Sequence, residues 1–188
     1  MILIIDTSSS VAAVATLNGR RFEAFMPARS PELRPLLRRL ARSPELSRVA
    51  VATGPGSFTG LRVGVSFGLG LAMGRGIPIV PLPTLDLQAA RTDEPVTAVV
   101  DAGRGRYYFQ VPGEGPRLGA PAEIPAKHHL VGSVADPARL IAAGHRFLPD
   151  GELRSFAEAA AKLLETAREV PYRNLEITYM QGPLKAKG

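Results

Sequence analysis

Two aspartates are the side chains best placed for chemistry in this 188-residue sequence. Asp6 follows the apolar run 2–5, and Asp101 follows the apolar run 96–100. If both runs are strands that end at one cleft, the two carboxylates could serve a metal–nucleotide complex. Aspartates that follow strands also bind backbone N–H groups in turns, and we favour this second interpretation.

Other catalytic groups are few. His128, His129 and His145 show no metal-ligand spacing, so we expect exposed or incidental histidines. The absence of cysteine excludes thiolate ligands and thiolate nucleophiles. Ser57 lies in Gly-Ser-Phe-Thr-Gly, which differs from the nucleophile elbow G-x-S-x-G. With no base near it in the sequence, Ser57 is interpreted as a helix cap, and we expect no metal or cofactor.

The stretch 49–74 organises the rest of the chain. An apolar strand at 49–52 leads into a turn, a cap from Ser57 or Thr59 and a helix over 58–74. Glycine inside a helix costs about 0.8–1.0 kcal/mol relative to alanine, so a closely packed neighbour must compensate. This neighbour could belong to the same domain or to another chain. The helix places glycines on one ridge at 60, 64 and 68, and on a neighbouring ridge at 70 and 74.

The glycine-rich turn does not match a nucleotide-binding signature. No Gly-Lys-Ser/Thr follows it, and the spacing of Gly54, Gly56 and Gly60 differs from the dinucleotide fingerprint. Generic phosphate binding at the N-terminus of the helix stays open.

Composition indicates a protein with a substantial aliphatic core. Hydrophobic residues make up 45% of the chain, and tryptophan is absent. The first residues lack a basic segment, and no apolar run approaches the roughly 20 residues of a membrane span; we therefore expect a soluble, cytoplasmic protein. The net charge is +6. The densest cluster of basic residues occurs at helical spacing and comprises Arg34, Arg38, Arg39 and Arg42. This cluster is either a contact for RNA phosphates or a solvated face of a helix.

The pattern of elements predicts a duplicated α/β unit. Strands are expected at 2–5, 11–17, 21–26, 77–80, 96–100, 106–111 and 129–134, and helices at 31–42, 83–91 and 155–168. Residues 112–125 should form a loop, and one short element is expected near 177–180. The two copies would begin at Ile2 and Thr97, which gives a first lobe over 1–95 and a smaller second lobe with the tail over 96–188.

Several motifs together resemble the TsaB family, formerly called YeaZ. The run 54–64, Gly-Pro-Gly-Ser-Phe-Thr-Gly-Leu-Arg-Val-Gly, is similar to the signature of that family. Further matches are Asp6-Thr7-Ser8, Pro83-Thr84-Leu85, Asp101-Ala102 followed by Gly105, Tyr107 and Tyr108, and the closing segment 179–186. In that segment Gln181 stands where the family carries arginine.

The resemblance implies an actin-like, hexokinase-type ATPase fold (ribonuclease H-like) with two lobes, a duplicated βββαβα core and a reduced second lobe. Family members are noncatalytic partners of TsaD, the transferase that places threonylcarbamoyl on the tRNA adenosine beside the anticodon, and TsaE joins this assembly. The pairing uses the helices at 31–42 and 58–74, and the same surface can form a homodimer.

On this basis three sets of residues are expected to matter. The partner interface would comprise Leu33, Leu36, Leu37, Gly60, Val63, Gly64, Phe67, Gly68 and Leu71. A degenerate nucleotide site would comprise Asp6, Thr7, Ser8 and Asp101, and the motif loop would comprise Gly54, Pro55, Gly56, Ser57 and Thr59. The alternatives are a stand-alone nucleotide-binding or phosphotransfer protein that uses Asp6, Thr7 and Asp101, and a peptidase that uses Ser57.

Overall fold

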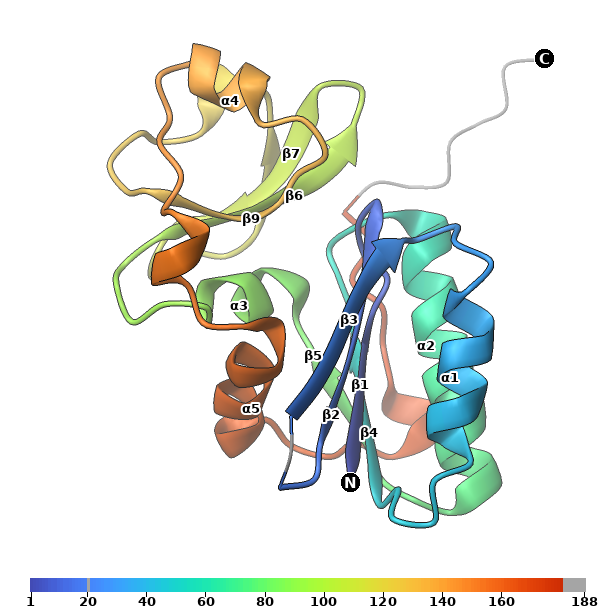
Figure 1. Cartoon of the computed structure of the whole chain (residues 1–188). Helices are drawn as coiled ribbons and strands as arrows, with labels where there is room; N and C mark the ends of the chain where they lie inside the picture. Colours follow the sequence, from blue (N-terminus) through green and yellow to red (C-terminus); the bar gives the residue numbers. More distant parts are fainter. Residues whose placement is uncertain (20, 181–188) are drawn as a thin grey trace, which may run out of the picture.

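A five-stranded mixed sheet forms the first lobe of the computed structural model, which describes residues 1–19 and 21–180 (Figure 1). The strand order is β3-β2-β1-β4-β5, with β1 antiparallel to β2 and parallel to β4. Ile4 pairs with Ala15 on one side and Ala50 on the other. The strands are β1 Ile2–Asp6, β2 Val11–Leu17, β3 Arg21–Pro27, β4 Arg48–Ala52 and β5 Ile79–Leu82.

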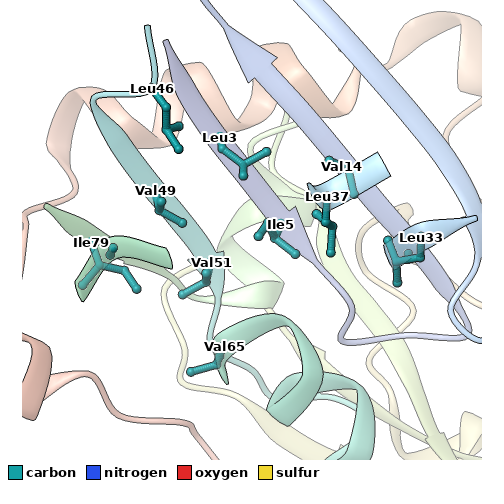
Figure 2. Packing of buried hydrophobic residues seen from close by; sticks show 12 residues of the cluster. Leu3, Ile5, Val14, Leu33, Leu37, Leu46, Val49, Val51, Val65 and Ile79 are labelled. Atoms are coloured by element: carbon teal, nitrogen blue, oxygen red, sulfur yellow. The ribbon is translucent and has the colours of Figure 1, made fainter. Parts of the chain in front are cut away.

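Two helices, α1 (Leu33–Ala41) and α2 (Phe58–Arg75), cover one face of this sheet (Figure 1). Leu33 and Leu37 are buried, as the amphipathic pattern of α1 requires, and Figure 2 shows their side chains among those of the strands. The expected helices at 31–42 and 58–74 are therefore confirmed to within two residues at each end.

The opposite face is covered by α5 (Phe156–Thr166), which comes from the C-terminal part of the chain (Figure 1). Its inner side is mainly alanine, so the helix lies close to Ile4, Ala15 and Ala50. Ser155 caps α5 in a reciprocal arrangement with Glu158. The division of the chain at residue 95 stays a prediction, but α5 packs on the first sheet and not on the second.

The second sheet has four strands in the order β8-β7-β6-β9. Its central strand β6 is antiparallel to β7 and parallel to β9, which is the pairing that β1 makes with β2 and β4. The helix α3 (Thr84–Ala89) lies between the two sheets and contacts β6, β9 and α5. The strands are β6 Thr97–Gly103, β7 Arg106–Gln110, β8 Arg117–Gly119 and β9 Leu130–Ser133.

Two short elements of the second lobe differ from the prediction. β8 lies within the expected loop 112–125, and the helix α4 (Ala138–Ala142) was not expected. Three and five residues are too few to give a recognisable periodicity, and both elements are formed because β7 and the lobe core provide the surface on which they pack.

The segment after α5 returns along α2 to the far end of the first sheet. Val170 forms a bridge with Ile79, and the Tyr172 hydroxyl donates to the carbonyl oxygens of Ala72 and Ile77 at 3.2 and 2.9 Å. The Thr178 N–H donates to the Thr53 carbonyl oxygen at 2.8 Å. Residues 177–180 form no helix or strand, contrary to the expected short element.

The glycine ridge of α2 packs inside the chain and not against a second helix. A Cβ atom on Gly60 or Gly64 would overlap Thr7, and one on Gly68 would overlap Val51, so the ridge lies directly on β1 and β4. Among residues 1–19 and 21–180, Gly70 and Gly74 have no neighbour within 4 Å of an added Cβ. Within the part of the chain that the structure describes, no helix is long and apolar enough to cross a membrane.

Alanine substitutions at Gly68 and Gly70 should therefore have opposite effects on stability. Gly68→Ala forces a methyl group into Val51, and we expect the free energy of unfolding to fall by about 1–3 kcal/mol. Gly70→Ala adds a methyl group in open space and should raise it by roughly 0.5–1 kcal/mol. Urea denaturation of both variants measures this difference, and equal effects would contradict the packing described.

Candidate functional site

The turn between β1 and β2 is held against the first turn of α2 by direct polar contacts. The Thr7 hydroxyl donates to the Gly60 carbonyl oxygen at 2.6 Å, and the Ser57 N–H donates to the Ser8 carbonyl oxygen at 2.6 Å. The added Cβ of Gly56 would overlap Ser8, so the motif loop lies against the turn with no room for a side chain. The signature glycines therefore permit two backbone segments to touch.

The N-terminus of α2 is capped by its own chain. The Ser57 hydroxyl accepts a hydrogen bond from the Gly60 N–H at 3.2 Å, as the cap interpretation predicts, whereas Thr59 is exposed. The carbonyl oxygens of Thr7 and Ser8 approach the same turn of the helix. Because these oxygens carry partial negative charge, this helix N-terminus is unfavourable for a phosphate.

Both candidate aspartates bind backbone N–H groups. Asp6 is buried, and its Oδ1 accepts from the Ser8 N–H at 2.8 Å. The Asp101 Oδ2 accepts from the Ala135 N–H, just after β9, at 2.6 Å. Burial raises the pKa of Asp6 and the pKa of Asp101, although the hydrogen bonds to Ser8 and Ala135 oppose the shift. Asp6 thus holds its own turn, as the favoured interpretation predicts, whereas Asp101 binds the segment after β9, far from it in the sequence.

Two cavities lie between the lobes, and Ser9 lines both of them. Its hydroxyl is 3.0 Å from that of Ser133 on β9, which joins the two lobes across the cleft. The smaller cavity, of about 260 Å³, reaches Asp6, and the larger, of about 800 Å³, reaches Asp101. The cleft therefore separates the two aspartates and does not bring them to one site. Among the described residues, no group of three acidic or histidine side chains could hold a metal ion.

The larger cavity is a cleft with mixed walls. One side comes from the β1–β2 turn and the motif loop, and the other from the β6–β7 turn. Its cationic and aromatic side chains are Arg29, Phe58, Arg104, Tyr108 and Tyr179.

The histidines have no shared site. His145 is buried, contrary to the expected exposure, and its Nε2 lies 2.9 Å from the Pro121 carbonyl oxygen. His129 is exposed and His128 is half-buried on the preceding loop. The burial of His145 results from its position after α4, at the core of the second lobe.

One contact at the cleft was not predicted, although the sequence supplies its members in two separate motifs. The Arg62 guanidinium lies 3.9 Å from the ring centre of Phe58, and its Nε donates to the Tyr179 hydroxyl at 3.1 Å. The rings of Phe58 and Tyr179 are 5.1 Å apart. This cluster attaches the returning tail to the first turn of α2. Gln181 and the remainder of the closing motif lie outside the described residues.

Several residues expected at a partner interface are unavailable for one. Leu33 and Leu37 are 5% and 2% exposed, and Gly64 and Gly68 are buried on the side of α2 that faces the sheet, so these four residues pack inside the first lobe. Gly60, Leu36, Phe67 and Leu71 are half-buried. Val63, at 48% exposed, is the one residue of the expected set with a largely exposed side chain.

The exposed side of α2 carries a different set of residues, which we call the α2 outer face. It follows the helical spacing of the second glycine ridge and contains no charged residue from Val63 to Gly74, while the exposed Arg62 lies at its N-terminal end. Met73 is 57% exposed, and the glycines leave the backbone open to close approach. The α2 outer face comprises Val63, Ser66, Gly70, Met73 and Gly74.

Known proteins match this chain in sequence. The family model of TsaD, the tRNA N6-adenosine threonylcarbamoyltransferase, matches residues 30–130. The tRNA threonylcarbamoyladenosine biosynthesis protein TsaB of Haemophilus influenzae is 30% identical over 57% of this chain and 52% of its own length. TsaB of Bacillus subtilis is 32% identical, with the same coverage. The chain spans about half the length of the curated relatives it matches.

Solved structures also match. A Pseudomonas aeruginosa protein described as similar to the peptidase YeaZ superposes with a TM-score of 0.71 at 20% identity, over 96% of this chain and 99% of that chain. YeaZ from Pseudomonas aeruginosa gives a TM-score of 0.57 at 25% identity, over 66% and 69%. Together with the mixed sheets, these matches confirm the expected ribonuclease H-like, actin-like class of fold.

Replacement of the buried Asp6 carboxylate should stabilise the fold at neutral pH. A carboxyl whose pKa is raised on folding contributes stability below its ordinary pKa and loses it as the pH rises through the raised value. Asp6→Asn keeps an oxygen for the Ser8 N–H without the buried charge. We expect a higher free energy of unfolding than for the unsubstituted chain at pH 7, and a gain that shrinks as the pH falls to about 4.

Thermal unfolding at several pH values measures this effect. Asp150→Asn is the control, because the Asp150 side chain is 95% exposed, and it should change stability little at any pH. A lower stability of Asp6→Asn at pH 7 would show that the Asp6 charge is compensated in the fold.

Proposed function

The chain belongs to the TsaB (YeaZ) family, and from this membership we propose that it is a noncatalytic subunit in the biosynthesis of threonylcarbamoyladenosine in tRNA. In this proposal it forms a heterodimer with the catalytic subunit TsaD and recruits TsaE in the cytoplasm. A homodimer through the same surface is the expected state without TsaD.

The α2 outer face is the observation that carries this proposal. From Val63 to Gly74 it carries no charged residue, is exposed and is rich in small residues, so another helix can approach its backbone closely, with Arg62 at the N-terminal end of the contact. Depletion of charge and the presence of methionine are typical of the central part of protein interfaces. We therefore propose that the partner interface lies on the α2 outer face, with Leu36 and Phe67 at its margins.

The state of the carboxylates supports a noncatalytic role. Asp6 and Asp101 each bind a turn N–H and face separate cavities. Phosphoryl transfer needs charged groups that converge on one reacting phosphate. Ser57, the peptidase candidate, caps α2 and has no base among its hydrogen-bond partners in the described residues.

We further propose that the two lobes are copies of one unit, with the second reduced. The order β8-β7-β6-β9 repeats β3-β2-β1-β4. Between β8 and β9 a single turn of 3₁₀ helix, Pro121–Glu123, takes the place that α1 has between β3 and β4. The lobes would then divide near residue 95, with α5 and the tail returning to the first.

A charge in the α2 outer face should abolish association with TsaD. Met73→Glu places a carboxylate on the most exposed large apolar side chain of the proposed contact, and we expect at least about 30-fold weaker binding, the effect of a hot spot of roughly 2 kcal/mol. Ile141→Glu is the matched control, because Ile141 on α4 is 56% exposed and Met73 is 57% exposed. Light scattering after size exclusion, with TsaD from the same source, measures both.

The two variants separate the possible results. Loss of the complex with Met73→Glu alone supports the interface. Retention of the complex by both variants contradicts it, and loss with both shows that the contact is not confined to α2.

A stand-alone nucleotide-binding protein is the second candidate, and the 800 Å³ cleft is the observation that favours it. Arg29 and Arg104 could bind phosphates there, and Tyr108 could contact a base. Under the proposed noncatalytic role, calorimetric titration of the isolated chain with ADP and Mg²⁺ up to millimolar concentration should give no heat of binding. Saturable binding that Asp101→Asn removes would favour the second candidate.

A further inference from the structure

The outward side of α1 is strongly basic. Four arginines and one proline make up this surface, which we call the α1 basic face, and all five are exposed. None of the ion pairs between described residues involves these four arginines. The α1 basic face comprises Arg34, Pro35, Arg38, Arg39 and Arg42.

The spacing of these arginines makes them a continuous stripe. Arg34, Arg38 and Arg42 follow each other at four-residue intervals, which on a helix gives one row about 12 Å long. The opposite side of α1 is fixed by Leu33 and Leu37 in the core, so the stripe cannot turn inward. Near its end Arg75 of α2 donates to the carbonyl oxygens of Ala41 and Ser43, which places a further cation beside it.

The chemistry of this stripe differs from that of the α2 outer face. A protein interface needs an apolar, desolvated centre around aromatic or aliphatic anchors. The α1 basic face has no such side chain, whereas the α2 outer face has Val63 and Met73 and only one neighbouring charge, Arg62 at its N-terminal end. The two neighbouring helices therefore present one surface suited to a protein and one suited to a polyanion.

We propose that the α1 basic face binds the phosphate backbone of folded RNA, without reading its sequence. Arginine contacts to phosphate supply affinity that is independent of base identity. The absence of aromatic side chains from this face argues against stacking of unpaired bases, so the contact is to the backbone. The proposal rests on the proposed function for the choice of RNA, and it adds a direct contact with the substrate.

A salt series tests the proposal with the full chain and a transfer RNA transcript. The triple variant Arg34→Gln, Arg38→Gln, Arg42→Gln keeps good helix formers on an exposed face. We expect roughly 10- to 100-fold weaker binding at about 50 mM salt, and a slope of log K against log salt that is smaller by about 2–3, since each phosphate contact contributes about 0.7–0.9.

A second triple variant serves as the control. It has the same net charge as the first triple variant, but its substitutions lie outside α1. Arg117→Gln, Arg146→Gln, Arg168→Gln removes three exposed arginines that lie outside α1, and it should bind the RNA within about threefold of the unsubstituted chain. Equal losses in both triple variants would overturn the proposal, because bulk charge alone would explain them. No measurable binding by the unsubstituted chain at 50 mM salt would also overturn it.

Light scattering with TsaD keeps this test separate from that of the proposed function. If the α1 triple variant loses TsaD and retains the RNA, the face is a protein contact and the proposal is wrong. If the α1 triple variant retains TsaD and loses the RNA, the RNA-binding proposal is supported. This conclusion does not depend on whether Met73→Glu supports the α2 outer face as the TsaD interface.

Discussion

The contact between the β1–β2 turn and the first turns of α2 sets the position of most other parts of the first lobe. It brings the Thr7 hydroxyl to the Gly60 carbonyl oxygen and the Ser57 N–H to the Ser8 carbonyl oxygen. These bonds form only because Gly56, Gly60 and Gly64 leave no Cβ between the two backbones. The helix then continues along β4 at the same short distance, with Gly68 on Val51.

This close packing explains why a helix with many glycines is stable. The loss of helix propensity, about 0.8–1.0 kcal/mol for each glycine, is offset for Gly60, Gly64 and Gly68 by contact with the sheet. Gly70 and Gly74 receive no such compensation from the residues that the structure describes, none of which lies within 4 Å of an added Cβ. Their presence on the exposed side is consistent with a helix that a second chain approaches.

The same packing fixes what the cleft can do. With the motif loop pressed on the turn, Asp6 is buried beside a small cavity, and Asp101 lies at a different, larger one. The Ser9–Ser133 contact joins the lobes between them. Two carboxylates that a linear sequence places at equivalent strand ends are thus separated by the way the lobes meet. The Arg62–Phe58–Tyr179 cluster attaches the tail to the first turn of α2, so that Phe58 and Tyr179 line the larger cavity.

The sequence alone determined the class of fold, the strands of both sheets except β8, and the two helices of the first face, because apolar spacing in β1, β4 and α1 is a local property. It also determined the Ser57 cap, which joins residues three positions apart. Short elements such as β8 depend on a neighbouring strand and leave no local pattern.

Only the tertiary structure decided which ridge of α2 is free. Both glycine ridges have the same spacing, and burial of Gly64 and Gly68 under β1 and β4 is a property of long-range packing. For the same reason Leu33 and Leu37 proved to be core residues, while the arginines of α1 kept their solvated positions. Residue types and their spacing give the surfaces that a helix can present, and contacts between distant segments determine which of them is left for a partner.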